Sequence, residues 1–435
     1  MVYTDLLFVF CFLPVYIIVS FMCEDSFKKN LVSAVFSLIF TAWLNPVYYA
    51  LIAVGIFLCY AVGRILEKNK SKPLRIAASA AICVLSAYPA LSLFALNTIK
   101  GSVSAFGFVL FAIRACLYLN DSQSGAERNV LNLFVYLASF EFMAVSPLYR
   151  YSDLKQSIES RKASLAMLSM GLERFIFGLG AVTILGYSLE RVRKAALFSG
   201  AVPYVNAIAG VLATVVLFYV VVFGYLKMSE GLMLMSGYRI DPLGSTFAVK
   251  SLAADHISAL YPSLGGFITC SLSKIPMPLT ALAAASACLV SGLALGFGAG
   301  MAAFLGLALA AIMFQTLFES KKTVLSGAFT AVMLAVGFIF MANQSLSGLV
   351  GWFGAFSPGK YQFDIGYEFY EEIKRSAVWV LASVVYVSPL CTAVGTAKRS
   401  FMAEGEHVYG AMRAVNVVFS TVVLVVSAVA MVCAA

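Results

Sequence analysis

Charged residues are scarce in this chain, at 12% of its 435 residues, about half the share found in a typical soluble domain. Hydrophobic residues make up 61%, and the mean hydropathy is +0.92. This composition excludes a soluble enzyme and a secreted disulfide scaffold, because one water-soluble core cannot bury so much apolar surface. Many apolar runs reach the roughly 20 residues that cross a bilayer core. Their lack of polar alternation excludes a membrane β-barrel.

Motifs for metal and nucleotide binding are also missing. The chain has only two histidines, and none of its nine cysteines forms a C-x-x-C pair, so no metal site is expected. A G-x-S-x-G turn, a P-loop and a Gly-rich dinucleotide motif are absent as well.

The basic residues lie in short segments between the apolar runs. The net charge is +9, and residues 64–75 carry five cations against one anion. The positive-inside rule and attraction to membrane lipid explain this charge more simply than nucleic acid, which we do not expect as a partner. We expect residues 64–75 to form a cytoplasmic loop.

The apolar runs predict an all-α polytopic membrane protein with about 11–13 membrane segments. Residues 6–22 are expected to form a retained first span, because no basic segment precedes them and no cleavage site follows. Residues 31–65 are too long for one crossing and predict a hairpin or a shallow re-entrant pair that turns at Asn45-Pro46. The other runs are residues 75–98, 103–119, 129–147, 164–188, 200–226, 278–296, 298–318, 324–342, 377–396 and 409–433.

Residues 357–375 differ from the rest of the chain, since they are polar and rich in Tyr and Glu. They indicate an ordered segment outside the bilayer, with an interfacial helix as one form of it. Because no linker divides the sequence, residues 1–435 are predicted to form a single domain.

Charged residues within apolar runs point to function, because a charge at membrane depth costs about 3 kcal/mol. Lys227 and Glu230 are three residues apart, which places them on one helix face where they can neutralise each other. They fit an interfacial pair, with the lysine reaching the headgroups, or a polar wall of a substrate cavity. Glu141 and Arg114 are two further charges in apolar surroundings.

His256 is the one histidine near a predicted membrane core. A histidine can act as a general base toward a hydroxyl. Asp255 is a poor orienting partner, since adjacent residues on a helix do not face each other. A structural or loop histidine is the other interpretation.

Several motifs occur in a characteristic order along the chain. Residues 6–14, 30–32, 40–46, 102–108 and 117–121 form the first blocks. The most specific stretch is Ser146-Pro-Leu-Tyr-Arg-Tyr-Ser-Asp-Leu-Lys-Gln156, followed by Gly171-Leu-Glu-Arg-Phe-Ile-Phe-Gly-Leu-Gly180. Residues 224–232 and 237–239 then complete a series that resembles the membrane-bound O-acyltransferase (MBOAT) family, in its bacterial alginate O-acetyltransferase branch. The resemblance is strongest over residues 1–320, so residues 321–435 are read as additional C-terminal membrane segments.

The resemblance implies an MBOAT-like helical bundle in the bacterial cytoplasmic (inner) membrane, with a funnel open to both faces. It implies an acyl donor on the cytoplasmic side, a thioester of coenzyme A or of acyl carrier protein, with no bound cofactor and no metal. The acceptor would be an exported polysaccharide or cell-envelope glycan, and a periplasmic or extracellular esterase-type partner would assist. The residues that it implies for substrate binding are Arg150, Tyr151, Asp153, Tyr225, Lys227 and Glu230.

The chain differs from the family at the positions that carry the reaction. The family motif W-H-I-S is present as Asp255-His-Ile-Ser258, and S-G-L-W-H-G corresponds to residues 291–296. Leu295 therefore stands where the family has its catalytic histidine, and leucine cannot accept a proton. Lys227 stands where the family has an acid. If the chain is catalytic, His256 is the candidate base.

Three functions fit these observations. The first is an O-acyltransferase of the O-acetylation type that acts on exported glycan. The second is a non-catalytic scaffold or regulatory subunit of an envelope polysaccharide machine, which is a pseudoenzyme. The third is a transporter or lipid flippase, which predicts two related halves, although the sequence shows no internal repeat.

Overall fold

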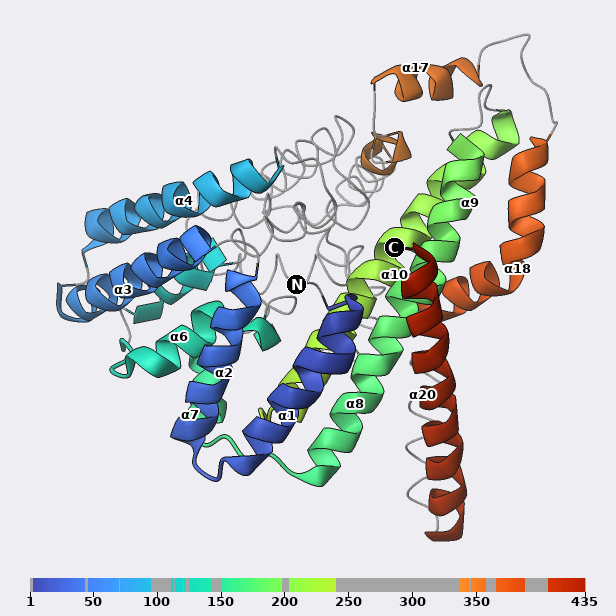
Figure 1. The fold of residues 1–435 in the computed structure, drawn as a ribbon. Coiled ribbons are helices and arrows are strands. Elements are labelled where there is room, and N and C mark those ends of the chain that lie inside the picture. Colours follow the sequence, from blue (N-terminus) through green and yellow to red (C-terminus); the bar gives the residue numbers. More distant parts are fainter. Residues whose placement is uncertain are drawn as a thin grey trace, which may run out of the picture. The chain divides into compact units, whose positions relative to one another are not determined.

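A computed structural model describes residues 3–43, 46–69, 71–94, 111–112, 114–119, 121–122, 125–142, 151–197, 203–239, 336–340, 342–343, 346–356, 365–387 and 406–434. All regular secondary structure within these ranges is helical (Figure 1), which confirms the predicted fold class. The elements are η1 (Phe8–Phe12), α1 (Leu13–Met22), α2 (Ser26–Ala42), α3 (Pro46–Asn69), α4 (Lys72–Phe94), α6 (Val130–Ala138), η3 (Phe140–Phe142), α7 (Tyr151–Glu159), α8 (Leu165–Gly180), η4 (Ala181–Gly186), α9 (Tyr187–Leu197), α10 (Tyr204–Met235), α17 (Leu346–Gly354), α18 (Tyr367–Val387) and α20 (Glu406–Ala434).

Four helical segments of the described chain are long and apolar enough to cross a membrane. They are Ala50–Asn69, Leu165–Leu197, Tyr204–Met235 and Val415–Cys433. Shorter apolar helices occupy Phe8–Met22 and Pro73–Ser86. The predicted segments at 278–296 and 298–318 lie outside the described residues, so the total of 11–13 stays a prediction.

The chain packs into two compact units. Unit 1 contains the described residues 3–175 and 226–239, and unit 2 contains the described residues 176–225 and 336–434. The prediction of a single domain over residues 1–435 stays a prediction.

The first helices of unit 1 follow the turns that the sequence indicates. Helix α2 ends at Ala42 and α3 begins at Pro46, and the two helices pack against each other. Proline suits the first position of a helix, where its missing N–H is not needed. The helices therefore break between Ala42 and Pro46, where the sequence predicts a turn; Asn45 itself lies outside the described residues.

Two expectations for unit 1 are wrong. Most of the predicted loop at residues 64–75 is helical, because α3 continues to Asn69 and α4 begins at Lys72; its cytoplasmic position stays a prediction. An ion pair of 2.8 Å between Arg64 and Glu67 supports this last part of α3. The run 129–147 is not one helix either, since α6 has nine residues and ends before Ser139. Just beyond that end, the Phe140 N–H donates to the Ser37 hydroxyl of α2 at 3.0 Å.

Aromatic rings form the core between α1, α2 and η3. The Phe140 ring lies 5.4 Å from Phe12, 5.8 Å from Phe40 and 5.0 Å from Tyr16, measured between centroids. Phe8 packs against Phe40 at 5.8 Å. These contacts hold η3 against the first two helices, directly beside the polar site described below.

Helices α8 and α10 approach backbone to backbone in unit 1. A Cβ atom added to Gly231 would lie 2.5 Å from the Gly171 carbonyl oxygen, and one added to Gly171 would lie 2.7 Å from the Gly231 oxygen. Only glycine permits this approach. It brings side chains near these glycines, Arg174 on α8 and Glu230 on α10, within reach of one another.

Helix α10 ends in a turn that glycine makes possible. Gly237 has a φ of +87°, and its N–H donates to the Leu234 carbonyl while the Tyr238 N–H donates to Met233, each at 3.0 Å. This is a Schellman motif. It positions Ser236 and Tyr238 beside the segment that follows α7.

Unit 2 is built around α9, which packs against α18. Arg193 is buried on α9, where it pairs with Glu190 at 2.7 Å and donates to the Ala342 carbonyl at 3.2 Å. Arg191 reaches Glu372 of α18 at 3.0 Å. Within the predicted polar segment, residues from 367 onward form the first half of α18, in one helix with the apolar residues that follow.

Helix α20 contacts η4, and over its described side chains, residues 415–433, most apolar groups are exposed. Gly180 lies so near α20 that an added Cβ atom would be 2.5 Å from Val423. The exposed side chains include Val415, Val417, Val418, Phe419, Val422, Val425, Val429 and Val432. Such a helix is suited to contact with lipid tails.

Candidate functional site

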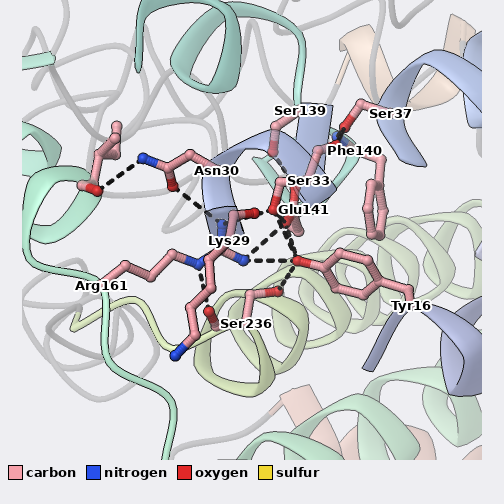
Figure 2. A network of polar contacts seen from close by, with 11 residues as sticks. Tyr16, Lys29, Asn30, Ser33, Ser37, Ser139, Phe140, Glu141, Arg161 and Ser236 are labelled. Atoms are coloured by element: carbon pink, nitrogen blue, oxygen red, sulfur yellow. Dashed lines mark hydrogen bonds and ion pairs between the residues drawn. The ribbon is translucent and has the colours of Figure 1, made fainter. Parts of the chain in front are cut away.

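An ion pair between Arg161 and Glu141 is fully buried in unit 1 (Figure 2). Arg161 Nη2 is 3.4 Å from Glu141 Oε1, and both side chains are 0% exposed. Arg161 follows α7, whereas Glu141 belongs to the turn η3. Removing two charges from water costs several kcal/mol for each ion, so their neighbours must replace the lost hydration.

Hydroxyl groups from the first two helices supply that replacement. The Tyr16 hydroxyl accepts from Arg161 Nη2 at 2.7 Å and donates to Glu141 Oε1 at 2.5 Å. The Ser33 hydroxyl accepts from Arg161 Nη1 at 2.6 Å and donates to the same carboxylate oxygen at 2.7 Å. Ser139 donates to the second oxygen, Oε2. Figure 2 shows these side chains converging on the two charges.

The end of α10 closes the network. Arg161 Nε donates to the Ser236 carbonyl at 2.5 Å, and its guanidinium carbon lies 4.2 Å from the centre of the Tyr238 ring. All three guanidinium nitrogens of Arg161 therefore have acceptors, and both Glu141 oxygens have donors. With so little capacity left for a substrate, the network joins helices and is a structural element of unit 1.

A second buried carboxylate, Glu127, joins the segment before α6 to α7. It accepts from the backbone N–H of Arg128 at 2.9 Å and of Asn129 at 2.8 Å, and from the Tyr151 hydroxyl. Lys155 lies 3.8 Å from the same residue. Burial raises the pKa of the Tyr151 hydroxyl, and the hydrogen bond to Glu127 raises it further. Tyr151 is predicted to bind substrate. In the structure its hydroxyl is protonated and donates its hydrogen bond to Glu127.

Lys227 and Glu230 form the ion pair that their spacing predicts. Lys227 Nζ lies 2.9 Å from Glu230 Oε2. The structure adds Arg174 from α8, whose Nη1 lies 3.8 Å from the same oxygen. Glu230 is 1% exposed, whereas Lys227 is 30% and Arg174 is 23% exposed. The sequence motif contains Arg174, but nothing in its spacing indicates that it meets α10.

The structure describes only some of the other predicted site residues. Tyr225 is half-buried on α10. The backbone of Asp153 belongs to α7, whereas its side chain lies outside the described part of the chain. Arg150, His256 and Leu295 lie outside the described residues. Their predicted roles stay predictions.

Arg114, the other charge noted in an apolar run, is 2% exposed. Its Nη1 donates to the Tyr136 carbonyl at 3.0 Å, and its Nε has no acceptor within the described ranges. In the same ranges, no group of three or more His, Cys, Asp or Glu side chains is placed to hold a metal ion.

The helices and their apolar surfaces define a multi-pass, all-α membrane protein. No protein-family model matches the chain. The chain is similar to the probable alginate O-acetylase AlgI of Pseudomonas putida, with 25% identity over 301 residues, which covers 61% of this chain and 62% of that relative.

Two further relatives carry the same name. The Azotobacter vinelandii protein is 24% identical over 301 residues, which covers 61% of this chain and 60% of the relative. The Pseudomonas aeruginosa protein is 24% identical over 301 residues, with 61% and 58% covered. The match spans about three fifths of each relative's length. These findings confirm the resemblance to the alginate O-acetyltransferase branch of the MBOAT family.

Proposed function

We propose that the protein is a membrane-bound O-acetyltransferase that acts on an exported polysaccharide or cell-envelope glycan, in the bacterial inner membrane. The observation that carries this proposal is the match over 301 residues to relatives named as probable alginate O-acetylases. The all-helical, apolar architecture supports it, because such a chain can accept a donor from one face of the membrane and serve an acceptor at the other.

The reaction transfers an acetyl group from a thioester, either acetyl-CoA or acetylated acyl carrier protein. The hydroxyl oxygen of the glycan attacks the thioester carbonyl, the C–S bond breaks, and the leaving thiolate takes up a proton. In this proposal His256 accepts the hydroxyl proton as a general base and passes it to the leaving thiolate. Lys227 and Glu230 contribute to the substrate cavity, together with Arg150, Asp153 and Tyr225. A periplasmic or extracellular esterase-type protein is the proposed partner.

The alternative is a non-catalytic subunit that organises an envelope polysaccharide machine. Leu295 favours it, because this residue stands where the family has a histidine, and a leucine side chain cannot exchange a proton. In that case His256 has no catalytic role.

The test is the acyl content of envelope glycans in cells that lack the gene, then complemented with wild type, His256→Ala or Leu295→His. Enzyme function predicts that deletion removes O-acetyl groups and that wild type restores them while His256→Ala does not. Unchanged acylation on deletion would overturn it.

A second assay separates the enzyme from the scaffold. Purified protein is given radiolabelled acetyl-CoA and a glycan acceptor, and label in the glycan is counted. With the esterase-type partner present in every reaction, an enzyme transfers label that its His256→Ala variant does not, whereas a scaffold and its His256→Ala variant give the same amount of label.

A further inference from the structure

The cluster of Arg174, Lys227 and Glu230 has more cations than its carboxylate can balance. Both cations lie near the same oxygen, Glu230 Oε2: Lys227 Nζ is 2.9 Å from it and Arg174 Nη1 is 3.8 Å from it. All three residues belong to unit 1, in the part where α8 and α10 meet at glycines. Glu173 precedes Arg174 on α8, but adjacent helix positions do not face each other. Among the described residues the cluster therefore has a net positive charge.

Arg174 has unused hydrogen-bonding capacity. A guanidinium presents five N–H donors in a planar fork. The contact of Arg174 with Glu230, at 3.8 Å, is too long for a hydrogen bond, and its buried Nη1 has no acceptor within the described part of the chain. This differs sharply from Arg161, whose three nitrogens all have acceptors. An arginine in this state is suited to a planar oxyanion that accepts two parallel hydrogen bonds.

The position of the cluster makes it reachable. Residues 207–226 contain no charged residue, and 20 helical residues measure about 30 Å, the thickness of a bilayer core. Lys227 is the next residue, so it is expected at the edge of the hydrocarbon region. The side chains of Lys227 and Arg174 are 30% and 23% exposed, so both cations are partly accessible.

We propose that Arg174 and Lys227, which share Glu230 as their counter-ion, form a binding subsite for a phosphate group. Arg174 supplies a two-pronged contact and Lys227 supplies a point charge. The phosphate source is a soluble donor such as coenzyme A or the headgroup of a phospholipid. Assignment to the donor rests on the proposed acetyl transfer, whereas the subsite itself does not.

The experiment measures binding of coenzyme A to the full purified chain in dodecyl maltoside micelles, which contain no phosphate. The affinities of wild type, Arg174→Gln and Lys227→Gln are compared, with Lys162→Gln as the matched control, because Lys162 is an exposed lysine of unit 1. A lost charge-assisted contact weakens binding by about tenfold or more. We expect that loss for the first two variants and no change for Lys162→Gln.

A second set of binding measurements, made with a phospholipid, identifies the source of the phosphate. Short-chain phosphatidylglycerol replaces coenzyme A, and its retention by the same variants is measured by native mass spectrometry. Loss of coenzyme A binding assigns the subsite to the donor, and loss of lipid retention alone assigns it to a headgroup. Both support a phosphate subsite. If neither ligand distinguishes the two variants from Lys162→Gln, the proposal is wrong.

Two further variants distinguish a specific loss of binding from misfolding. Arg174→Lys keeps the charge and is expected to retain part of the binding, whereas Glu230→Gln removes the competing carboxylate and is expected to leave binding equal or tighter. Weaker binding in Glu230→Gln with an unchanged melting temperature would count against the subsite. Because binding is read without turnover, a chain that binds coenzyme A normally but transfers no acetyl group contradicts the proposed function only.

Discussion

At the scale of single residues, the stability of unit 1 depends on the pairing of Arg161 with Glu141, since both charged side chains are fully buried. In Glu141→Gln the guanidinium stays buried without its counter-charge. Removing one partner of a buried pair costs about 3–5 kcal/mol, and we expect a loss of that size in the free energy of unfolding. Thermal unfolding of the purified protein in detergent micelles measures it.

The matched control is Glu159→Gln, because the Glu159 side chain is 49% exposed. This variant is expected to stay within about 0.5 kcal/mol of wild type. If Glu141→Gln unfolds at the same temperature as Glu159→Gln, the network does not hold unit 1 together.

Asn206 presents the opposite case, a buried amide without partners. It is 0% exposed, and neither its Oδ1 nor its Nδ2 has a hydrogen-bond partner in the described chain. Leucine has a similar shape and no polar atoms, so Asn206→Leu is expected to raise stability by about 1 kcal/mol or more. Asn132→Leu is the comparison and is expected to lower stability, because the Asn132 amide accepts from Asn30 at 3.1 Å. A lower melting temperature for Asn206→Leu would show that water or a ligand satisfies the amide.

The two charged sites show which side-chain contacts a single sequence can reveal. Lys227 and Glu230 are three residues apart, and helix geometry alone predicts their contact. Arg161 meets Tyr16 and Ser33 across 145 and 128 residues, and no local pattern indicates such a pairing. The polar residues around Arg161 also suggest a solvated loop rather than a buried cation.

At the scale of elements, the end of α10 depends on a single glycine. Gly237 has a φ of +87°, and an added Cβ atom would lie 2.7 Å from the Ala163 nitrogen. Gly237→Ala is therefore expected to cost about 1–2 kcal/mol for the left-handed backbone and more for the close contact. Gly351→Ala in α17 is the control, because an added Cβ atom meets nothing within 4 Å there. Alanine favours a helix interior, so this control is expected to be neutral or stabilising. Equal melting temperatures for the two variants would contradict this account.

Helix boundaries were predictable where a local breaker sets them. The turn before Pro46 follows from proline chemistry, and α3 begins there. The end of α6 at Ser139 has no such signal, since apolar residues continue beyond it. Beyond this end, the Phe140 N–H donates to the Ser37 hydroxyl, 103 residues away in the sequence, which is tertiary information. The residues expected to perform chemistry, His256 among them, lie outside the described elements.

At the scale of the whole molecule, lipid is the environment that makes the exposed apolar surface reasonable. Helix α20 exposes a series of valines along Val415–Cys433. In water such a surface would promote aggregation, whereas in a bilayer it contacts acyl chains. The apolar composition that excludes a soluble fold thus predicts that α20 contacts lipid.

A charge placed at the middle of α20 tests that expectation. Val425 is 57% exposed and lies near the centre of the span Val415–Cys433. Arginine at the centre of a membrane helix costs about 2.5–3.5 kcal/mol, so Val425→Arg is expected to lower the amount of protein recovered in carbonate-washed membranes. Tyr367→Arg, at a 78% exposed position in the polar first turn of α18, is expected to be recovered like wild type. In water an exposed Val→Arg change would be harmless, so equal recovery of both variants would mean that α20 does not face lipid.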